Sequence, residues 1–174
     1  AIVPQPNWRD DLRDFKKLGK PRLFFAVTAG AMDSMVNHYT ANLRLRSNDA
    51  YTPGGKAGFR PDRTVDTYTK ILKRLYPHTP VVVGGIEASL RRLTHYDYWS
   101  NKLQQSILLT SGADLLIYGM GDKVIREVAK AMRNGFNMKL LRGLRQVGFI
   151  ADKEYVERLY NGKTIVLNSF EECQ

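Results

Sequence analysis

Residues 81–85 read VVVGG, a short run of β-branched apolar residues that ends in two glycines. The run does not alternate between apolar and polar residues, which is typical of a strand buried on both faces. Two further segments share this design: residues 22–28 (RLFFAVT) lead to Gly30, and residues 114–118 (DLLIY) lead to Gly119. Strands of this kind occur mainly in parallel sheets covered by helices. The three segments therefore predict the centre of an α/β domain.

Helical patterns accompany these strands. Residues 63–76 and 123–133 place apolar side chains at helical spacing, and residues 10–18 form a shorter pattern that stops at Gly19. Strands that alternate with helices argue for right-handed βαβ units. We therefore expect an open, mainly parallel sheet with helices on both faces.

Weaker patterns predict more strands at residues 142–151 and 165–167. Residues 1–3 are also strand-like, and the chain stops after residues 168–172 with no closing element. We therefore expect both ends to be cut points in a longer protein.

The composition excludes several classes of protein. Hydrophobic residues make up 43% of the 174 residues and charged residues 25%, as in a folded globule of one domain. There is no apolar run of the roughly 20 residues that span a membrane, and no signal peptide, so we expect a cytoplasmic protein without membrane contact. Cys173 is the only cysteine, which excludes an intramolecular disulfide and a thiolate cluster site.

The net charge of +10 would attract phosphates or an acidic partner. The basic residues are spread along the chain, with a looser concentration from Arg133 to Arg145, and no RNA-recognition or zinc-finger motif occurs. We favour a solvated surface with a face that docks a missing part of the protein. A stand-alone nucleic-acid-binding module stays as the alternative.

Candidate site residues follow the predicted strands. Ligands of open parallel sheets bind outside the carboxyl ends of the strands, where glycine allows a close approach of the backbone. The glycines after residues 28, 83 and 118 should therefore line one edge, although ordinary βα turns would need the same glycines. The full set of candidate mouth or docking residues is Thr28, Gly30, Asp33, Gly84, Gly85, Glu87, Arg91, Arg92, His95, Asp97, Trp99, Gly119 and Gly121.

Several polar segments allow more than one interpretation. Residues 95–99 (HYDYW) should lie near the same edge and dock a partner or pack. Arg91 and Arg92 could hold a phosphate or carboxylate, or form a surface pair. His38 fits a structural role better than catalysis. Residues 43–60 are too polar for the core, and a loop of that length is typically functional or disordered. No catalytic or metal-ligating residue is predicted.

Several long strings, TAGAMDSMVNHYT (28–40), DAYTP (49–53), RPDR (60–63) and GGIEASLRR (84–92) followed by HYDYWS (95–100), closely resemble the N-terminal region of YgiQ-type radical SAM proteins. The match covers nearly the whole chain. More generally, the chain is similar to the flavodoxin-like, cobalamin-binding-like domain that precedes many radical SAM cores.

The resemblance implies that residues 1–151 are a partial accessory domain and that residues 152–174 connect it to a C-terminal radical SAM core. In that family a Cys-x3-Cys-x2-Cys motif of the core holds a [4Fe-4S] cluster that cleaves S-adenosylmethionine, so this chain should hold no cofactor. The resemblance also implies a sheet of order 2-1-3-4-5 whose first strand is missing here and whose second strand is Ile2-Val3-Pro4-Gln5-Pro6. The Asp-x-His-x-x-Gly signature of cobalamin binding does not occur, and we expect no cobalamin.

Overall fold

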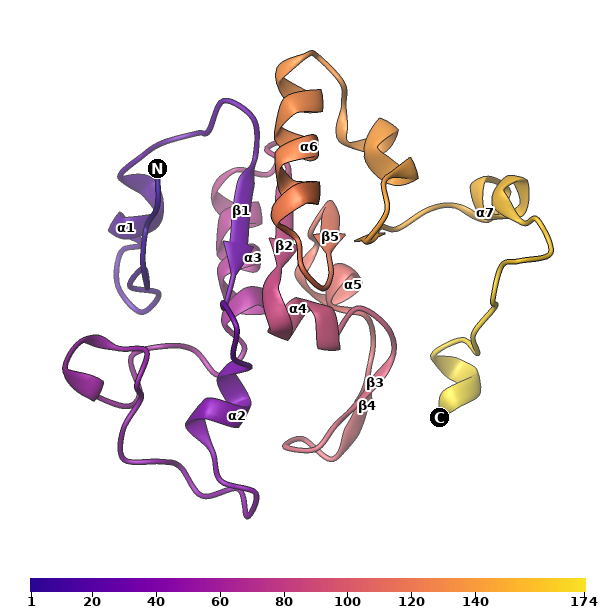
Figure 1. Ribbon diagram of the computed structural model, residues 1–174. Helices are drawn as coiled ribbons and strands as arrows, with labels where there is room; N and C mark the ends of the chain where they lie inside the picture. Colours follow the sequence, from indigo (N-terminus) through magenta and orange to yellow (C-terminus); the bar gives the residue numbers. More distant parts are fainter.

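The computed structural model describes residues 1–174 and confirms an open α/β sheet flanked by helices (Figure 1). Four strands lie in the order β1-β2-β5-β6. The strands β1 (Phe25–Thr28), β2 (Val81–Gly84) and β5 (Leu115–Ile117) are parallel, and the two-residue β6 (Val147–Gly148) runs antiparallel to β5. A separate antiparallel hairpin pairs β3 (His95–Asp97) with β4 (Lys102–Gln104). The helices are α1 (Arg13–Lys16), α2 (Ser34–His38), α3 (Thr64–Leu75), α4 (Gly85–Leu90), α5 (Ile107–Ser111), α6 (Asp122–Arg133) and α7 (Lys153–Leu159).

The central strands β2 and β5 have no polar face because helices cover them on both sides of the sheet. Val81 and Val83 of β2 belong to a core with α3 and α5, whereas Val82 between them packs in a second core with α6. Successive side chains of a strand point to opposite faces, so one valine run supplies both cores. The prediction of helices on both faces is therefore confirmed.

Three predicted strands are wrong or reduced. Residues 1–3 and 165–167 form no strand, and Ile165 and Val166 are 84% and 77% exposed. A segment with high strand propensity does not form a strand by itself, because its backbone N–H and C=O groups need a neighbouring strand as hydrogen-bond partner. Within residues 142–151 only Val147–Gly148 pairs with the sheet, since a 3₁₀ helix (Met138–Gly143) occupies the start of that segment.

The strand β1 lies at the edge of the sheet and pairs only with β2. Its sequence FAVT carries no charge or proline to protect the edge, and Ala26 is exposed. Figure 1 shows α6 in front of β2 and β5 and no helix in front of β1. The neighbouring strand that the resemblance implies would pair with this edge, and this pairing stays a prediction. No helix is both long and apolar enough to cross a membrane.

Candidate functional site

The carboxyl ends of β1, β2 and β5 meet at one cleft of about 750 Å³. Because the strands are parallel, the glycines that follow them are brought together there, as the sequence predicted. Candidate residues in its lining are Thr28, Gly30, Gly84, Gly85, Gly119 and Gly121. Most of the remaining lining is apolar and includes Ile86, Met120 and Ile125 from outside the strands and Val82 from β2. The cleft offers backbone groups and apolar surface, with Asp122 as its one ionisable side chain.

Close packing of the strand ends explains two of these glycines. Gly85 has φ +81°, and a Cβ atom there would lie 2.4 Å from Oγ1 of Thr28 and 2.9 Å from the carbonyl oxygen of Gly30. A Cβ atom at Gly121 would lie 2.9 Å from Cγ2 of Ile117. A Cβ atom at Gly30, whose φ is +80°, would have no other atom within 4 Å. Packing and backbone conformation therefore require glycine at Gly85, and Gly121 leaves room for the Ile117 side chain, whereas Gly30 faces open space.

Glu87 points away from the cleft into the core. Its side chain is fully buried, where Oε1 accepts a hydrogen bond from the backbone N–H of Val65 at 2.8 Å and Oε2 accepts one from the Ser34 hydroxyl at 3.0 Å. Helix α3 has no side-chain cap of its own, so this carboxylate satisfies a free amide in its first turn. Burial raises the pKa of Glu87. The geometry assigns Glu87 to joining α2, α3 and α4.

Arg91 and Arg92 have different surroundings. Arg91 is buried and forms an ion pair with Asp33, which also caps α2 by accepting from the N–H groups of Met35 and Val36. Burial alone would lower the pKa of Arg91, but the hydrogen bond with Asp33 together with the nearby carboxylates outweighs burial, and the pKa is raised. Arg92 is exposed, with its guanidinium 5.2 Å from the ring centroid of Tyr118. Arg91 is thus engaged within the protein, whereas Arg92 is accessible to a partner.

The segment 95–99 forms β3 and the turn of the hairpin, near the carboxyl end of the sheet (Figure 1). Asp97 is buried, where it accepts hydrogen bonds from Arg63 and Ser100. Burial alone would raise the pKa of Asp97, but Ser100 and Arg63 lower it. His95 and Trp99 are partly exposed, and none of the three lines the cleft. The hairpin therefore packs beside the cleft without forming its wall.

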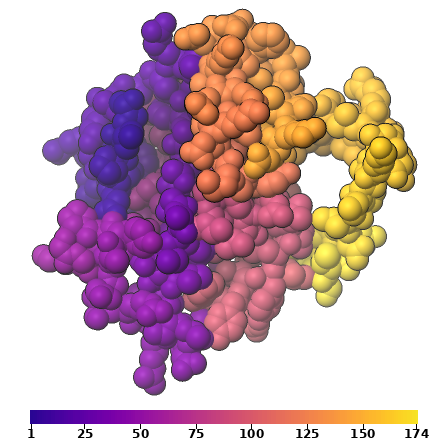
Figure 2. Space-filling model, in the orientation of Figure 1, coloured from indigo at the N-terminus to yellow at the C-terminus, as the bar shows by residue number.

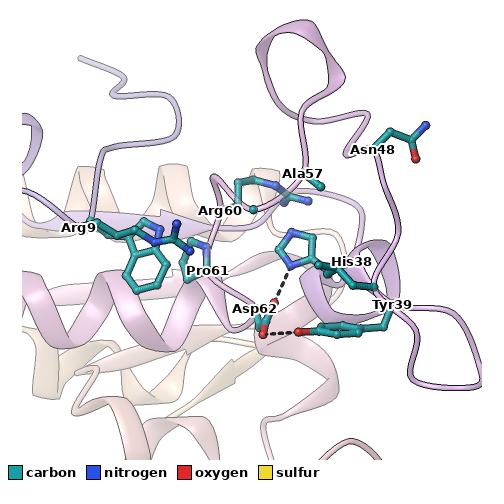
Figure 3. Close-up of a pocket in the computed structure, with 11 residues that line it drawn as sticks. Arg9, His38, Tyr39, Asn48, Ala57, Arg60, Pro61 and Asp62 are labelled. Atoms are coloured by element: carbon teal, nitrogen blue, oxygen red, sulfur yellow. Dashed lines mark hydrogen bonds and ion pairs between the residues drawn. The ribbon is translucent and has the colours of Figure 1, made fainter.

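A second cluster surrounds His38 and was not predicted as a site (Figure 3). The His38 side chain is 4% exposed, with Nδ1 2.8 Å from Oδ1 of Asp62 and Nε2 3.2 Å from Oδ2 of Asp49. Arg60 forms two hydrogen bonds to Asp49, at 2.8 and 3.1 Å, and the Tyr39 hydroxyl donates to Asp62. Beside them lies a pocket of about 180 Å³. The His38 ring therefore lies between the carboxylates of Asp62 and Asp49, one at each ring nitrogen.

The cluster corrects the interpretation of residues 43–60 as too polar for the core. Asp49, Thr52 and Arg60 are buried, because opposite charges and hydrogen bonds compensate one another there. Burial alone would raise the pKa of Asp49, but hydrogen bonds from Arg60, the Tyr51 N–H and Asn37 lower it to about 2. The hydrogen bond to Asp62 raises the pKa of Tyr39. The sequence signal was the concentration of His, Asp and Arg in 38–62, which no local spacing rule connects.

The chain does not fit the cofactors of a radical SAM core. It brings no three His, Cys, Asp or Glu side chains together where they could hold a metal ion, and Cys173 alone cannot hold a cluster that needs several thiolates. The cleft lining contains no histidine that could serve as a lower ligand of cobalamin. No step of cofactor chemistry can therefore be assigned to these residues.

The fold and cleft define an α/β domain that presents an apolar cavity at the carboxyl edge of a parallel sheet. Residues 1–174 match the family described as "Radical SAM N-terminal", and the chain belongs to that family.

Relatives described as UPF0313 proteins support this assignment. One from Porphyromonas gingivalis is 59% identical over 99% of the chain, and one from Bacteroides thetaiotaomicron is 68% identical over 76%. One from Clostridium perfringens is 50% identical over 99%. The chain spans about a quarter of the length of these relatives, with shares of 27%, 22% and 25%. No solved structure matches the chain.

Proposed function

We propose that this chain is the accessory N-terminal domain of a radical SAM iron–sulfur enzyme and that it shapes the mouth of that enzyme's active site. The observation that carries the proposal is the apolar cleft at the carboxyl edge, where three strand ends converge. Such a cleft can form a wall for a substrate and exclude water, which strengthens electrostatic interactions in a reaction site. The [4Fe-4S] cluster and S-adenosylmethionine would belong to the part of the protein outside residues 1–174.

The last part of the chain supports a connecting role within this proposal. From residue 152 to residue 174 no side chain is buried, and the residues of α7 are exposed except for the half-buried Tyr155. These residues would link the domain of residues 1–151 to the radical SAM core.

The test compares the parent protein with residues 1–174 after anaerobic treatment with iron and sulfide. The parent should gain the broad absorption of a cluster and cleave S-adenosylmethionine, whereas residues 1–174 should stay colourless because one cysteine offers too few ligands. Iron bound stoichiometrically within one monomer of residues 1–174 would contradict the proposal.

The role at the mouth needs its own variant. Ala26→Trp in the parent would fill the cleft, because Ala26 is exposed and lines it. Turnover should fall while the cluster content stays unchanged, and Thr110→Trp on the exposed side of α5 serves as the control. Equal turnover in both variants would remove the cleft from the reaction.

One observation keeps the nucleic-acid alternative open. The exposed side of α6 carries Lys123, Arg126, Lys130 and Arg133, with Glu127 among them. Binding through phosphates weakens steeply as salt increases. Submicromolar binding of RNA or DNA at physiological salt would favour this alternative, and its absence would favour the accessory domain.

A further inference from the structure

The outer side of α4 carries apolar side chains that nothing in the chain covers. Ile86 and Leu90 are one helical turn apart and are 37% and 57% exposed, and Leu93 just beyond the helix is 47% exposed. The i, i+4, i+7 spacing normally marks the buried face of a helix. The opposite side of α4, with Glu87 and Ala88, already lies in the core. Helix α4 therefore buries one side in the core and exposes apolar side chains on the other side.

Met120 extends this surface across the cleft. It follows β5, is 81% exposed, and lines the cleft together with Ile86. We call Ile86, Leu90, Leu93 and Met120 the rim patch. In Figure 2 the pink segment that contains α4 reaches the surface below α6, with no other segment across it. Single exposed apolar residues are ordinary, but a group of four beside a cavity indicates an interaction surface.

We infer that the rim patch is the docking surface for the part of the same protein that follows residue 174, an inference that rests on the proposed function. The relatives are about four times as long as this chain, so a large partner is available within one polypeptide. The family description places the chain at the N-terminal end. The C-terminus lies toward the same end of the molecule as the carboxyl ends of the strands (Figure 1), which is the side of the rim patch.

The surroundings of the patch define what the partner must present. The rim patch contains no charge, and the exposed Arg92 lies between Leu90 and Leu93 in the sequence. An apolar partner surface with an acidic group at its margin would fit, and the net charge of +10 favours the approach of such a surface. Because Ile86 and Met120 also line the cleft, a docked partner would close it and complete a shared cavity.

The test uses the full-length parent with Leu90→Asp and Met120→Asp, and Leu109→Asp as the matched control. Leu109 is 55% exposed on α5, close to the 57% of Leu90, but lies outside the rim patch. Each rim variant should increase the rate of proteolytic cleavage at residues 152–174 roughly tenfold, as expected for the loss of about 1.4 kcal/mol of docking energy. Leu109→Asp should leave that rate unchanged, and all three variants should unfold at the temperature of the wild type.

Two outcomes would overturn the inference. Rim variants that match the control in a parent that holds its cluster would show that docking occurs elsewhere while the proposed function stands. A wild-type parent that is dimeric, and becomes monomeric in the rim variants, would show that the patch joins two copies. A parent without a cluster would instead defeat the proposed function, and the proteolysis rates would still report on docking.

Discussion

Asp49 and Glu87 are both buried carboxylates, yet their pKa values shift in opposite directions. Asp49 receives hydrogen bonds from a guanidinium, an amide side chain and a backbone N–H, which together outweigh the cost of burial. Glu87 has two neutral donors and a more distant Arg91, so its burial dominates. The number and charge of the donors, rather than burial itself, decide which acid stabilises the fold as an anion.

We expect Asp49 to make the protein sensitive to acid. The pKa of Asp49 in the folded protein is about 2, below the ordinary value of 3.8. The ionised side chain therefore contributes its full stabilisation above pH 3.8 and loses it as the pH falls towards 2. The shift corresponds to about 2 kcal/mol. The difference in unfolding free energy between wild type and Asp49→Asn should shrink by about that amount from pH 6 to pH 2, measured by urea denaturation. A difference that does not change with pH would contradict the charged cluster around His38.

Two replacements of Glu87 should distinguish the contribution of its hydrogen bonds to stability from the contribution of its charge. Glu87→Leu leaves the buried N–H of Val65 without an acceptor and should cost about 2 kcal/mol of unfolding free energy. Glu87→Gln keeps an acceptor and removes a charge that is costly to bury. Because the pKa is raised, wild-type stability falls as pH rises through the interval above 4.5, and the Gln variant should gain on it there. Chemical denaturation at pH 5 and pH 8 measures both effects, and equal losses for Leu and Gln would argue against the capping role.

At the scale of the elements, the junction of β2 with α4 is the tightest point beside the cleft. The N–H of Ile86 donates to the carbonyl oxygen of Gly30 at 3.1 Å, which joins the end of β1 to the start of α4. This approach leaves no room for a side chain at Gly85, where the chain also has a positive φ. The geometry of the cleft therefore depends on that residue.

Gly85→Ala and Gly135→Ala form a matched pair that tests this junction. Both glycines have a positive φ, +81° and +88°, but a Cβ atom at Gly135 would meet nothing within 4 Å. Gly135→Ala should cost about 1 kcal/mol for the left-handed backbone alone. Gly85→Ala should cost about 1–3 kcal/mol more, because Thr28 and Gly30 must move. Thermal and urea unfolding compare the two, and similar costs would show that the junction is looser than the structure indicates.

At the scale of the whole molecule, we propose that the chain divides at about residue 151. The two cores lie before that residue, and the following segment contributes no buried side chain. Limited proteolysis of the parent should therefore cut first within residues 152–174 and release two stable parts, identified by mass spectrometry. A first cut within residues 43–60 would instead show that the cluster around His38 does not hold that loop in place.

The sequence by itself determined the sheet, its parallel strands and the convergence of their glycines. Residues 81–85 are apolar without alternation, and only a sheet covered on both faces buries them all. It also identified the family, because its unusual strings extend over most of the chain. It failed at residues 1–3 and 165–167, where the apolar pattern lacks a neighbouring strand.

Only the tertiary structure decided which polar residues face the cleft and which are buried. Glu87 and Arg91 follow the Gly-Gly turn as the sequence shows, but the packing of α4 on α2 and α3 turns both side chains inward. His38, Asp49 and Asp62 are 11 to 24 residues apart, and their contacts arise from the path of the loop. Local patterns report which face of an element is apolar, whereas the pairing of buried charges depends on segments that meet only after the chain has folded.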